Sequence, residues 1–134
     1  MPVLKEPKRR PRSRASAKKA GSWHERKTAD YLKAHVSELI DRRVKTGAKD
    51  RGDIGGLRIW GTRLVVECKD TVTVSIGPHL TEAEVERGND DALAGMVVYK
   101  RTGRSEPGAA VVVMTLADLV AMVTGSRRHI ISDY

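Results

Sequence analysis

Aromatic residues and cysteine are scarce in this chain. Its 134 residues include no Phe, two Trp, three Tyr and one Cys. A surface that stacks single-stranded bases on many aromatic rings is therefore poorly supplied, and a single cysteine excludes an internal disulfide. The four histidines show no i, i+4 pair and no spacing with the cysteine that is typical of zinc sites. Any chemistry must come from other residue types.

Long apolar runs are also missing, so the sequence predicts no membrane-spanning helix. The basic N-terminus is followed by polar residues rather than by the apolar core of a signal peptide. We therefore expect a cytoplasmic protein with no membrane partner. The glycines around Gly52 lack the Lys-Ser/Thr of a phosphate-binding loop, so no small-molecule cofactor is expected.

Positive charge is concentrated at the N-terminus. The formal net charge is +8, and residues 1–20 carry +7 of it. We expect residues 1–21 to form a basic, disordered arm and residues 22–134 a single domain. A basic arm on a nearly neutral body suggests a polyanionic partner, most simply nucleic acid, with Arg9 and Arg10 as candidate contacts. A solubilising tail or an import-like cluster would have the same composition.

Two strand-like runs, residues 53–60 and 63–69, are joined by the turn formers Gly61-Thr62. They predict an antiparallel hairpin, because β-branched and aromatic residues flank a short turn. The pair Gly55-Gly56 inside the first run indicates a bulge or a close backbone approach.

Two acids and a lysine are predicted to meet at the open end of this hairpin. Glu67 and Lys69 share one face of the strand, whereas Cys68 points to the other. Asp53 falls roughly opposite the end of the second run. Paired carboxylates suit Mg²⁺, and a lysine can place or deprotonate an attacking water. Ordinary cross-strand pairs on a surface hairpin would give the same pattern, so the motif needs its context.

A helix is predicted over residues 22–40. Ser22 and Glu25 match a capping box, in which the serine caps and the glutamate reaches back. The helical period also places Glu25 at the head of the apolar stripe, so this carboxylate either caps the helix or faces a site. The stripe consists of Ala29, Leu32, Val36, Leu39 and Ile40.

The C-terminal half predicts a second helix over residues 80–94 with a capping box at Thr81 and Glu84. Its glutamates, including Glu82 and Glu86, are typical of a solvated face. The remaining expected elements are a short strand at 44–46, an extended stretch at 71–76 ending at Gly77-Pro78, buried strands at 96–100 and 109–115, and a helix capped by Thr115 with an apolar stripe of Leu116, Leu119, Val120 and Val123 ending at Gly125.

Four further cations are candidate DNA contacts. Lys49 and Arg51 precede Asp53 in a polar loop, and Lys100 and Arg101 follow an apolar run. Such side chains hold phosphates at a nucleic-acid interface, although a solvated loop explains them equally well.

The helical Glu25, the Gly52-Asp53 pair and the Glu67-Cys68-Lys69 triplet resemble the PD-(D/E)-x-K nuclease superfamily over residues 22–100. The small size and the basic arm are similar to its Holliday junction resolvase branch from phages and archaea. Glycine stands where the motif's name has proline. The resemblance implies an α/β fold with a restriction-endonuclease-like αβββαβ core, a mixed central sheet flanked by helices, and an extra C-terminal strand and helix.

The resemblance also implies the roles of the site residues. Asp53 and Glu67 would hold Mg²⁺, with Mn²⁺ as a substitute, together with the Cys68 carbonyl, while Glu25 completes the site and Lys69 orients the water. The expected activity is paired symmetric nicking of four-way or other branched DNA by a homodimer, in the host cytoplasm for a phage protein. Two alternatives stay open: a restriction-like or exonuclease-like DNase, and a non-catalytic basic nucleic-acid-binding protein.

Overall fold

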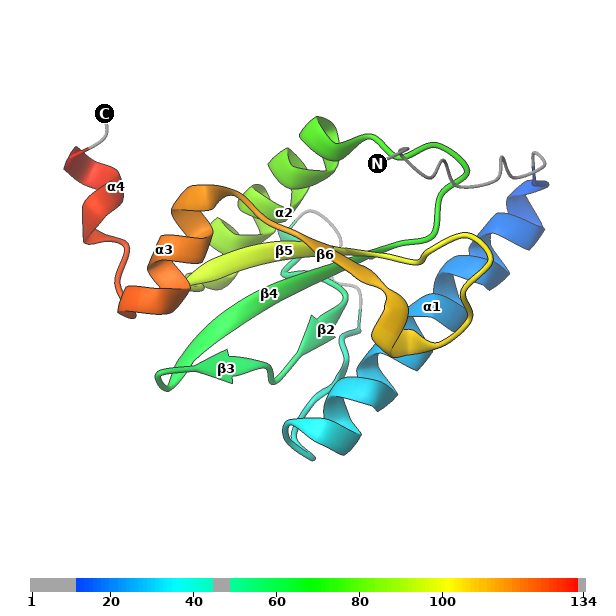
Figure 1. Ribbon diagram of the computed structural model, residues 1–134, viewed down its shortest axis with the longest axis horizontal. Helices are drawn as coiled ribbons and strands as arrows, with labels where there is room; N and C mark the ends of the chain where they lie inside the picture. The colour runs from blue at the N-terminus through cyan, green and yellow to red at the C-terminus, as the bar shows by residue number, and fades with distance from the viewer. Residues whose placement is uncertain (1–11, 45–48, 133–134) are drawn as a thin grey trace, which may run out of the picture.

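The computed structural model describes residues 12–44 and 49–132. The described elements run in the order α1 (Arg14–His35), β1 (Asp41–Arg42), β2 (Ile54–Gly55), β3 (Arg58–Ile59), β4 (Thr62–Lys69), α2 (Ile76–Asp90), β5 (Ala94–Tyr99), η2 (Pro107–Ala109), β6 (Val111–Val113), α3 (Leu116–Thr124) and α4 (Arg128–Ser132) (Figure 1). None of the helices in the described part is long and apolar enough to cross a membrane.

A mixed sheet forms the centre of the molecule, with strand order β1-β2-β4-β5-β6 and with β3 paired to β4. Only β4 and β5 are parallel among the described pairs, and α2 makes the crossover between them. Residues 64–68 of β4 and all of β5 are buried because both faces of these two strands are covered. The expectation of an α/β protein with a mixed sheet flanked by helices is confirmed.

The two faces of the sheet pack against different helices. On one face, Ala29 of α1 and Ala121 of α3 belong to a core cluster with Val66 and Cys68 of β4. On the other face, Ala83 of α2 packs with residues of β5. Figure 1 shows α1 and α3 at opposite ends of the sheet, so each helix covers part of one face.

The predicted hairpin is present, with its turn at Trp60-Gly61 rather than Gly61-Thr62 and with a break in its first strand. Ile54 pairs with Val66, and Arg58 pairs with Arg63 on the other side of the break. The break lies at Gly56, where φ is +89° and a Cβ would come within 2.4 Å of a backbone oxygen, so only glycine fits. The close backbone approach expected from the paired glycines is therefore confirmed.

The first helix was placed too late in the sequence. It begins at Arg14 rather than Ser22 and ends at His35, and Ser13 is its N-cap, accepting a hydrogen bond from the backbone N–H of Ser16. Residues 14–21 therefore belong to the helix and not to the expected arm, as their alanines and lysines favour helix formation. Of the predicted stripe, Val36 and Leu39 lie beyond the helix and are exposed. Residues 1–11 of the expected arm lie outside the described residues.

The second helix also begins earlier than predicted. Gly77-Pro78 lies in the first turn of α2, where a proline is tolerated because the first N–H groups have no helical partner. The Thr81 hydroxyl donates to the Gly77 carbonyl, so it does not cap the helix. The C-terminal residue Asp90 is followed by Asp91 in the left-handed conformation.

The short strands differ from the predictions at two places. The first edge strand lies at residues 41–42 rather than 44–46, of which 45–46 lie outside the described residues. Residues 71–75 make no strand. The C-terminal strand is present as β6, but Val111 and Val112 are exposed because β6 is an edge strand and not a buried one.

The C-terminal helix is present with the predicted caps, Thr115 at its start and Gly125 at its end. Its orientation is different from that expected. The buried residues of α3 are Asp118 and Ala121, whereas the predicted apolar stripe is largely exposed, with Leu116 76% and Val123 69% accessible. The small Ala121 lets the helix approach the sheet closely.

Candidate metal centre

Strand β4 carries two candidate site residues, Glu67 and Lys69, into the space beneath α2. Glu67 is buried, and its Oε1 lies 3.6 Å from the Nζ of Lys69. The alternation of a strand puts both on one face, as predicted, and the intervening Cys68 belongs to the core cluster on the opposite face. Burial raises the pKa of the Cys68 thiol above its ordinary value, so this residue is a buried apolar side chain and not a nucleophile.

Asp53 lies next to the functional part of β4, as the hairpin predicts. Its backbone N–H donates to the Val66 carbonyl (2.9 Å), and its Oδ2 accepts from the Cys68 N–H (2.8 Å). Gly52 permits this arrangement, because φ is +95° and a Cβ there would lie 3.0 Å from the Val66 oxygen. The side chain is 5% exposed.

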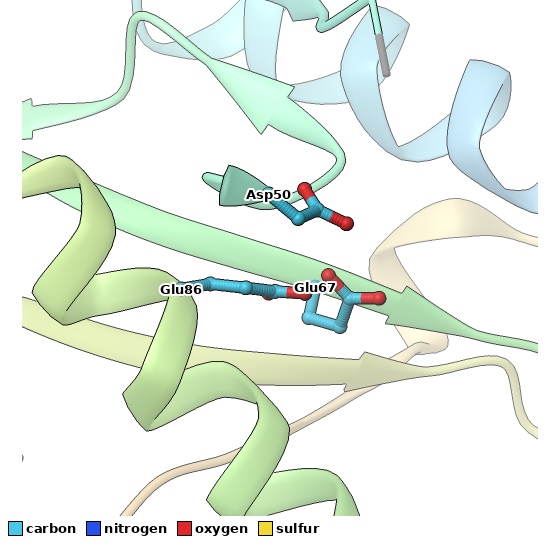
Figure 2. A group of neighbouring side chains, drawn as sticks. All are labelled: Asp50, Glu67 and Glu86. Atoms are coloured by element: carbon cyan, nitrogen blue, oxygen red, sulfur yellow. The ribbon is translucent and has the colours of Figure 1, made fainter. Parts of the chain in front are cut away.

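Three carboxylates from distant parts of the chain converge at the centre of this space. One ligand atom each of Asp50, Glu67 and Glu86 lies within 4.8 Å of the others (Figure 2). They come from the loop before β2, from β4 and from α2. The group fulfils the distance condition for holding a metal ion.

Glu67 and Glu86 each have a buried oxygen without a partner. Glu86 is 3% exposed and Glu67 is 5% exposed. The Oε2 atom of each side chain accepts no hydrogen bond. Buried carboxylate oxygens are costly when left unsatisfied, so they fit a position where a cation supplies the missing partner.

The electrostatics of the pair favour a cation as well. Burial is the main cause that raises the pKa of Glu67, followed by a hydrogen bond shared with Glu86 and by the nearby Asp53 charge. Burial likewise raises the pKa of Glu86, although the hydrogen bond from Glu67 opposes it. The pair thus retains a proton in the absence of metal, and a divalent ion would take the place of that proton.

Lys69 stands between two carboxylates. Its Nζ lies 2.9 Å from Glu82 and 3.6 Å from Glu67. Burial lowers the pKa of Lys69, but the hydrogen bond from Glu82 and the charges of both glutamates outweigh it, and the net pKa is raised. The ammonium is therefore charged at neutral pH and is suited to holding a water or a phosphate oxygen rather than to removing a proton.

The structure places Glu25 with another partner. Its carboxylate accepts from Arg42 (3.3 Å), which also donates to Ser22. It is not one of the three carboxylates that lie within 4.8 Å of one another in the described part of the chain. Ser22 lies in the interior of α1, so the predicted capping box at Ser22 and Glu25 is wrong.

The predicted DNA contacts fall into three groups. Lys49 and Arg51 flank Asp50 and line an open cavity of about 700 Å³ with Arg43. Lys100 follows β5, and its backbone N–H donates to the Lys69 carbonyl (3.2 Å). Arg101 lies in the loop after Lys100. Arg9 and Arg10 lie outside the described residues.

Comparison of the chain with protein-family models, curated proteins and solved structures finds no match. What the site does must therefore be argued from its own geometry.

Two members of the carboxylate group, Asp50 and Glu86, were missed in the sequence. The prediction of a solvated face is wrong for Glu86 because the buried face of α2 contains Ala83, Glu86 and Asp90, at helical spacing. That spacing is the signal that could have found Glu86. Asp50 lies in a polar loop without a periodic pattern, so the sequence contains no comparable indication of its position.

Proposed function

We propose that this protein is a Mg²⁺-dependent endonuclease that hydrolyses phosphodiester bonds in DNA. The observation that carries the proposal is the group of Asp50, Glu67 and Glu86, in which the two buried glutamates have unsatisfied oxygens, beside Asp53 and Lys69. Buried acids without an arginine or lysine partner for each oxygen are rare unless they bind a cation.

The donor set favours a hard divalent cation. All three side chains offer oxygen, which Mg²⁺ and Mn²⁺ prefer, and no histidine or cysteine belongs to the group. We infer that Glu67 and Glu86 supply the main ligands, with Asp50 and Asp53 beside them. Such an ion, when bound, activates water and neutralises charge on the phosphate and the leaving oxygen.

The residues of the chain have separate roles in this proposal. Glu82 holds the Lys69 ammonium in place, and Lys69 orients the attacking water and compensates the charge that builds on the phosphoryl oxygens. Lys49 and Arg51, at the edge of the cavity beside Asp50, hold the flanking phosphates. The expected products are a 5′-phosphate and a 3′-hydroxyl.

The finer assignment follows from the sequence pattern. The similarity to PD-(D/E)-x-K nucleases and the basic N-terminal segment support a restriction-endonuclease-like enzyme of the Holliday junction resolvase type. We propose four-way or other branched DNA as the substrate. A two-fold dimer is the natural assembly, because symmetric cuts in two strands require two equivalent sites. The enzyme would act in the cytoplasm.

One gel assay tests the proposal. The protein is incubated with a labelled four-way junction, a flap, a linear duplex and an RNA–DNA hybrid, with and without Mg²⁺. We expect Mg²⁺-dependent cleavage, strongest on the junction, and loss of cleavage in Lys69→Ala and Asp53→Asn while junction binding persists. Equal cleavage of the linear duplex would contradict the junction assignment. Binding without any metal-dependent product would contradict the nuclease.

A further inference from the structure

An open groove runs along the solvent side of α1, apart from the carboxylate group. Its volume is about 980 Å³. No carboxylate is among its lining residues, which are Ala15, Ser16, Lys18, Lys19, Ala20, Ser22, Trp23, Arg26 and Arg42. Small side chains form much of the floor and four cations surround it, so an extended anion can approach the helix closely.

The cations of the groove are available to a ligand. Lys18 and Lys19 make no ion pair with any carboxylate in the described part of the chain. Arg26 contacts Asp30 and Asp41, but these side chains are more than half exposed, and exposed pairs are weak enough to exchange for a phosphate. Arg42 holds Glu25 and also faces the groove.

Trp23 presents an aromatic ring in the middle of this positive surface. The side chain is 62% exposed, and the Nζ of Lys27 lies 5.9 Å from its ring centroid. On its other side, Trp23 borders a small cleft that also contains Lys100 and Arg101. Cations therefore surround an exposed aromatic ring.

We propose that the groove beside α1 binds a nucleic-acid strand, with its phosphates on Lys18, Lys19, Arg26 and Arg42 and one unpaired base stacked on Trp23. This inference rests on the proposed DNA substrate and identifies where an unpaired segment of it lies. Rings of bases stack on tryptophan regardless of sequence, and lysines and arginines track the backbone. The charge complementarity of the lining selects a polyanion.

The groove meets the rest of the molecule through Trp23 and Arg42. Lys100, which borders Trp23 in the small cleft, donates its backbone N–H to the carbonyl of Lys69. Arg42 faces the groove, while the neighbouring Arg43 pairs with Asp90 of α2. The groove and the carboxylate group therefore lie on opposite faces of the sheet, because α1 packs on the Cys68 face and Glu67 lies beneath α2. A strand in the groove would be held apart from the cut site, so loss of the groove should weaken binding more than it slows the chemical step.

Fluorescence of Trp23 tests the stacking directly. In Trp60→Phe, Trp23 is the only tryptophan left. We expect a short oligothymidine to quench it in the presence of EDTA, where no cleavage occurs. Trp23→Ala should weaken binding of the oligonucleotide by about 5- to 150-fold, the range measured for one stacked base. Unchanged fluorescence on saturation with the oligonucleotide, or parental affinity in Trp23→Ala, would overturn the stacking.

Salt dependence tests the cations. Lys18→Gln/Lys19→Gln removes two charges from the groove, and Arg58→Gln/Arg128→Gln removes two exposed charges from β3 and α4, which lie away from α1 in Figure 1. We expect the first pair to lower the slope of log K against log salt by about 1.4 for a single strand, at about 0.7 per phosphate contact. The second pair should leave it unchanged. Equal effects of the two pairs would overturn the groove.

The two proposals fail in different ways. Quenching of Trp23 fluorescence and salt-dependent binding through Lys18 and Lys19, without metal-dependent cleavage, would support the groove proposal and contradict the nuclease proposal. Cleavage that persists with parental substrate affinity in Trp23→Ala and Lys18→Gln/Lys19→Gln would contradict the groove alone. Binding of a polyglutamate peptide at equal salt with the same Trp23 quenching as the oligonucleotide would show an acidic peptide as the occupant and overturn the assignment to nucleic acid.

Discussion

Two sets of buried carboxylates in the described part of the chain differ in their partners. In the first set, each acid meets arginine. Both oxygens of Asp90 bind the Arg43 guanidinium (3.3 and 3.1 Å), and Arg63 lies 3.4 Å from one of them. Asp118 is 2.7 Å from Arg127, and its other oxygen accepts the Gly95 N–H.

In the second set, the acids meet one another. Glu67 and Glu86 are as deeply buried as Asp90 and Asp118, yet each retains an unsatisfied oxygen, and the nearby Asp50 adds a further carboxylate. The first set holds separate elements together. Asp90, at the end of α2, contacts Arg43 and also Arg63 of β4, and Asp118 of α3 accepts from the Gly95 N–H of β5. The second set has no such structural role, so we assign it to function.

The largest expected effect concerns activity. Glu67→Gln keeps the shape of the side chain but removes a ligand charge, and we expect junction cleavage to fall by about 1000-fold or more, as for loss of a key electrostatic group. Cleavage rates of the labelled junction at saturating Mg²⁺ measure it. Glu84→Gln, on the same helix as Glu86 but paired with Arg87 at the surface, is the control and should cut at the parental rate. Cleavage by Glu67→Gln within tenfold of the parent would remove Glu67 from the site.

The next effect concerns stability and should appear in the first set only. Asp90→Ala removes the buried carboxylate that the partly exposed Arg43 and Arg63 share, so the free energy of unfolding should fall by about 3 kcal/mol. Glu86→Gln should cost little or even stabilise, because a neutral amide replaces a carboxyl whose charge is disfavoured by burial. Urea unfolding of the metal-free proteins measures both. A loss in Glu86→Gln as large as that in Asp90→Ala would contradict the division into two sets.

Metal should stabilise the second set. At a Mn²⁺ concentration of about 100 times its dissociation constant, the free energy of unfolding should rise by about 2.7 kcal/mol. The rise should be absent in Glu67→Gln and unchanged in Asp118→Asn. Thermal unfolding with and without Mn²⁺ shows it, and a similar rise in Glu67→Gln would place the ion elsewhere.

The smallest effect is a dependence on pH. The folded state raises the pKa of Glu67 and of Glu86 through burial, so it holds more protons than the unfolded chain above about pH 4.5. Metal-free stability should therefore be greatest at low pH and fall by about 1 kcal/mol or more as pH rises. Saturating metal should reduce the fall. Urea titrations between pH 4.5 and 8 measure it, and stability that rises across this range in the metal-free protein would contradict the shared proton.

The hairpin and its acids were predictable because local rules agree there. The turn nevertheless lies at Trp60-Gly61, one residue before the predicted Gly61-Thr62. Strand alternation fixes which face Glu67 shares with Lys69, and the antiparallel pairing of β2 with β4 brings Asp53 beside them. The C-terminal helix was also predictable at both ends, since Thr115 and Gly125 are strong capping residues.

The remainder of the site was not predictable because it violates the usual pattern of burial. A search for apolar residues on the buried face of α2 passes over Glu86, a buried carboxylate. The helix predicted over residues 80–94 is too long at its C-terminal end. Ala92 and Leu93 fit its apolar pattern, but in the structure they lead into β5. In α3, the apolar stripe gave the wrong face, because the buried face is occupied by Ala121 and by an aspartate satisfied by Arg127.

Titration calorimetry with Mn²⁺ tests the central claim most directly. The measurement compares the metal-free protein with Glu86→Gln, on α2, and with Glu25→Gln, whose carboxylate pairs with Arg42. We predict one bound ion per chain in the parent and in Glu25→Gln, and loss of that binding in Glu86→Gln. Retention of binding in Glu86→Gln together with its loss in Glu25→Gln would contradict the account and return the site to the arrangement expected from the sequence motif.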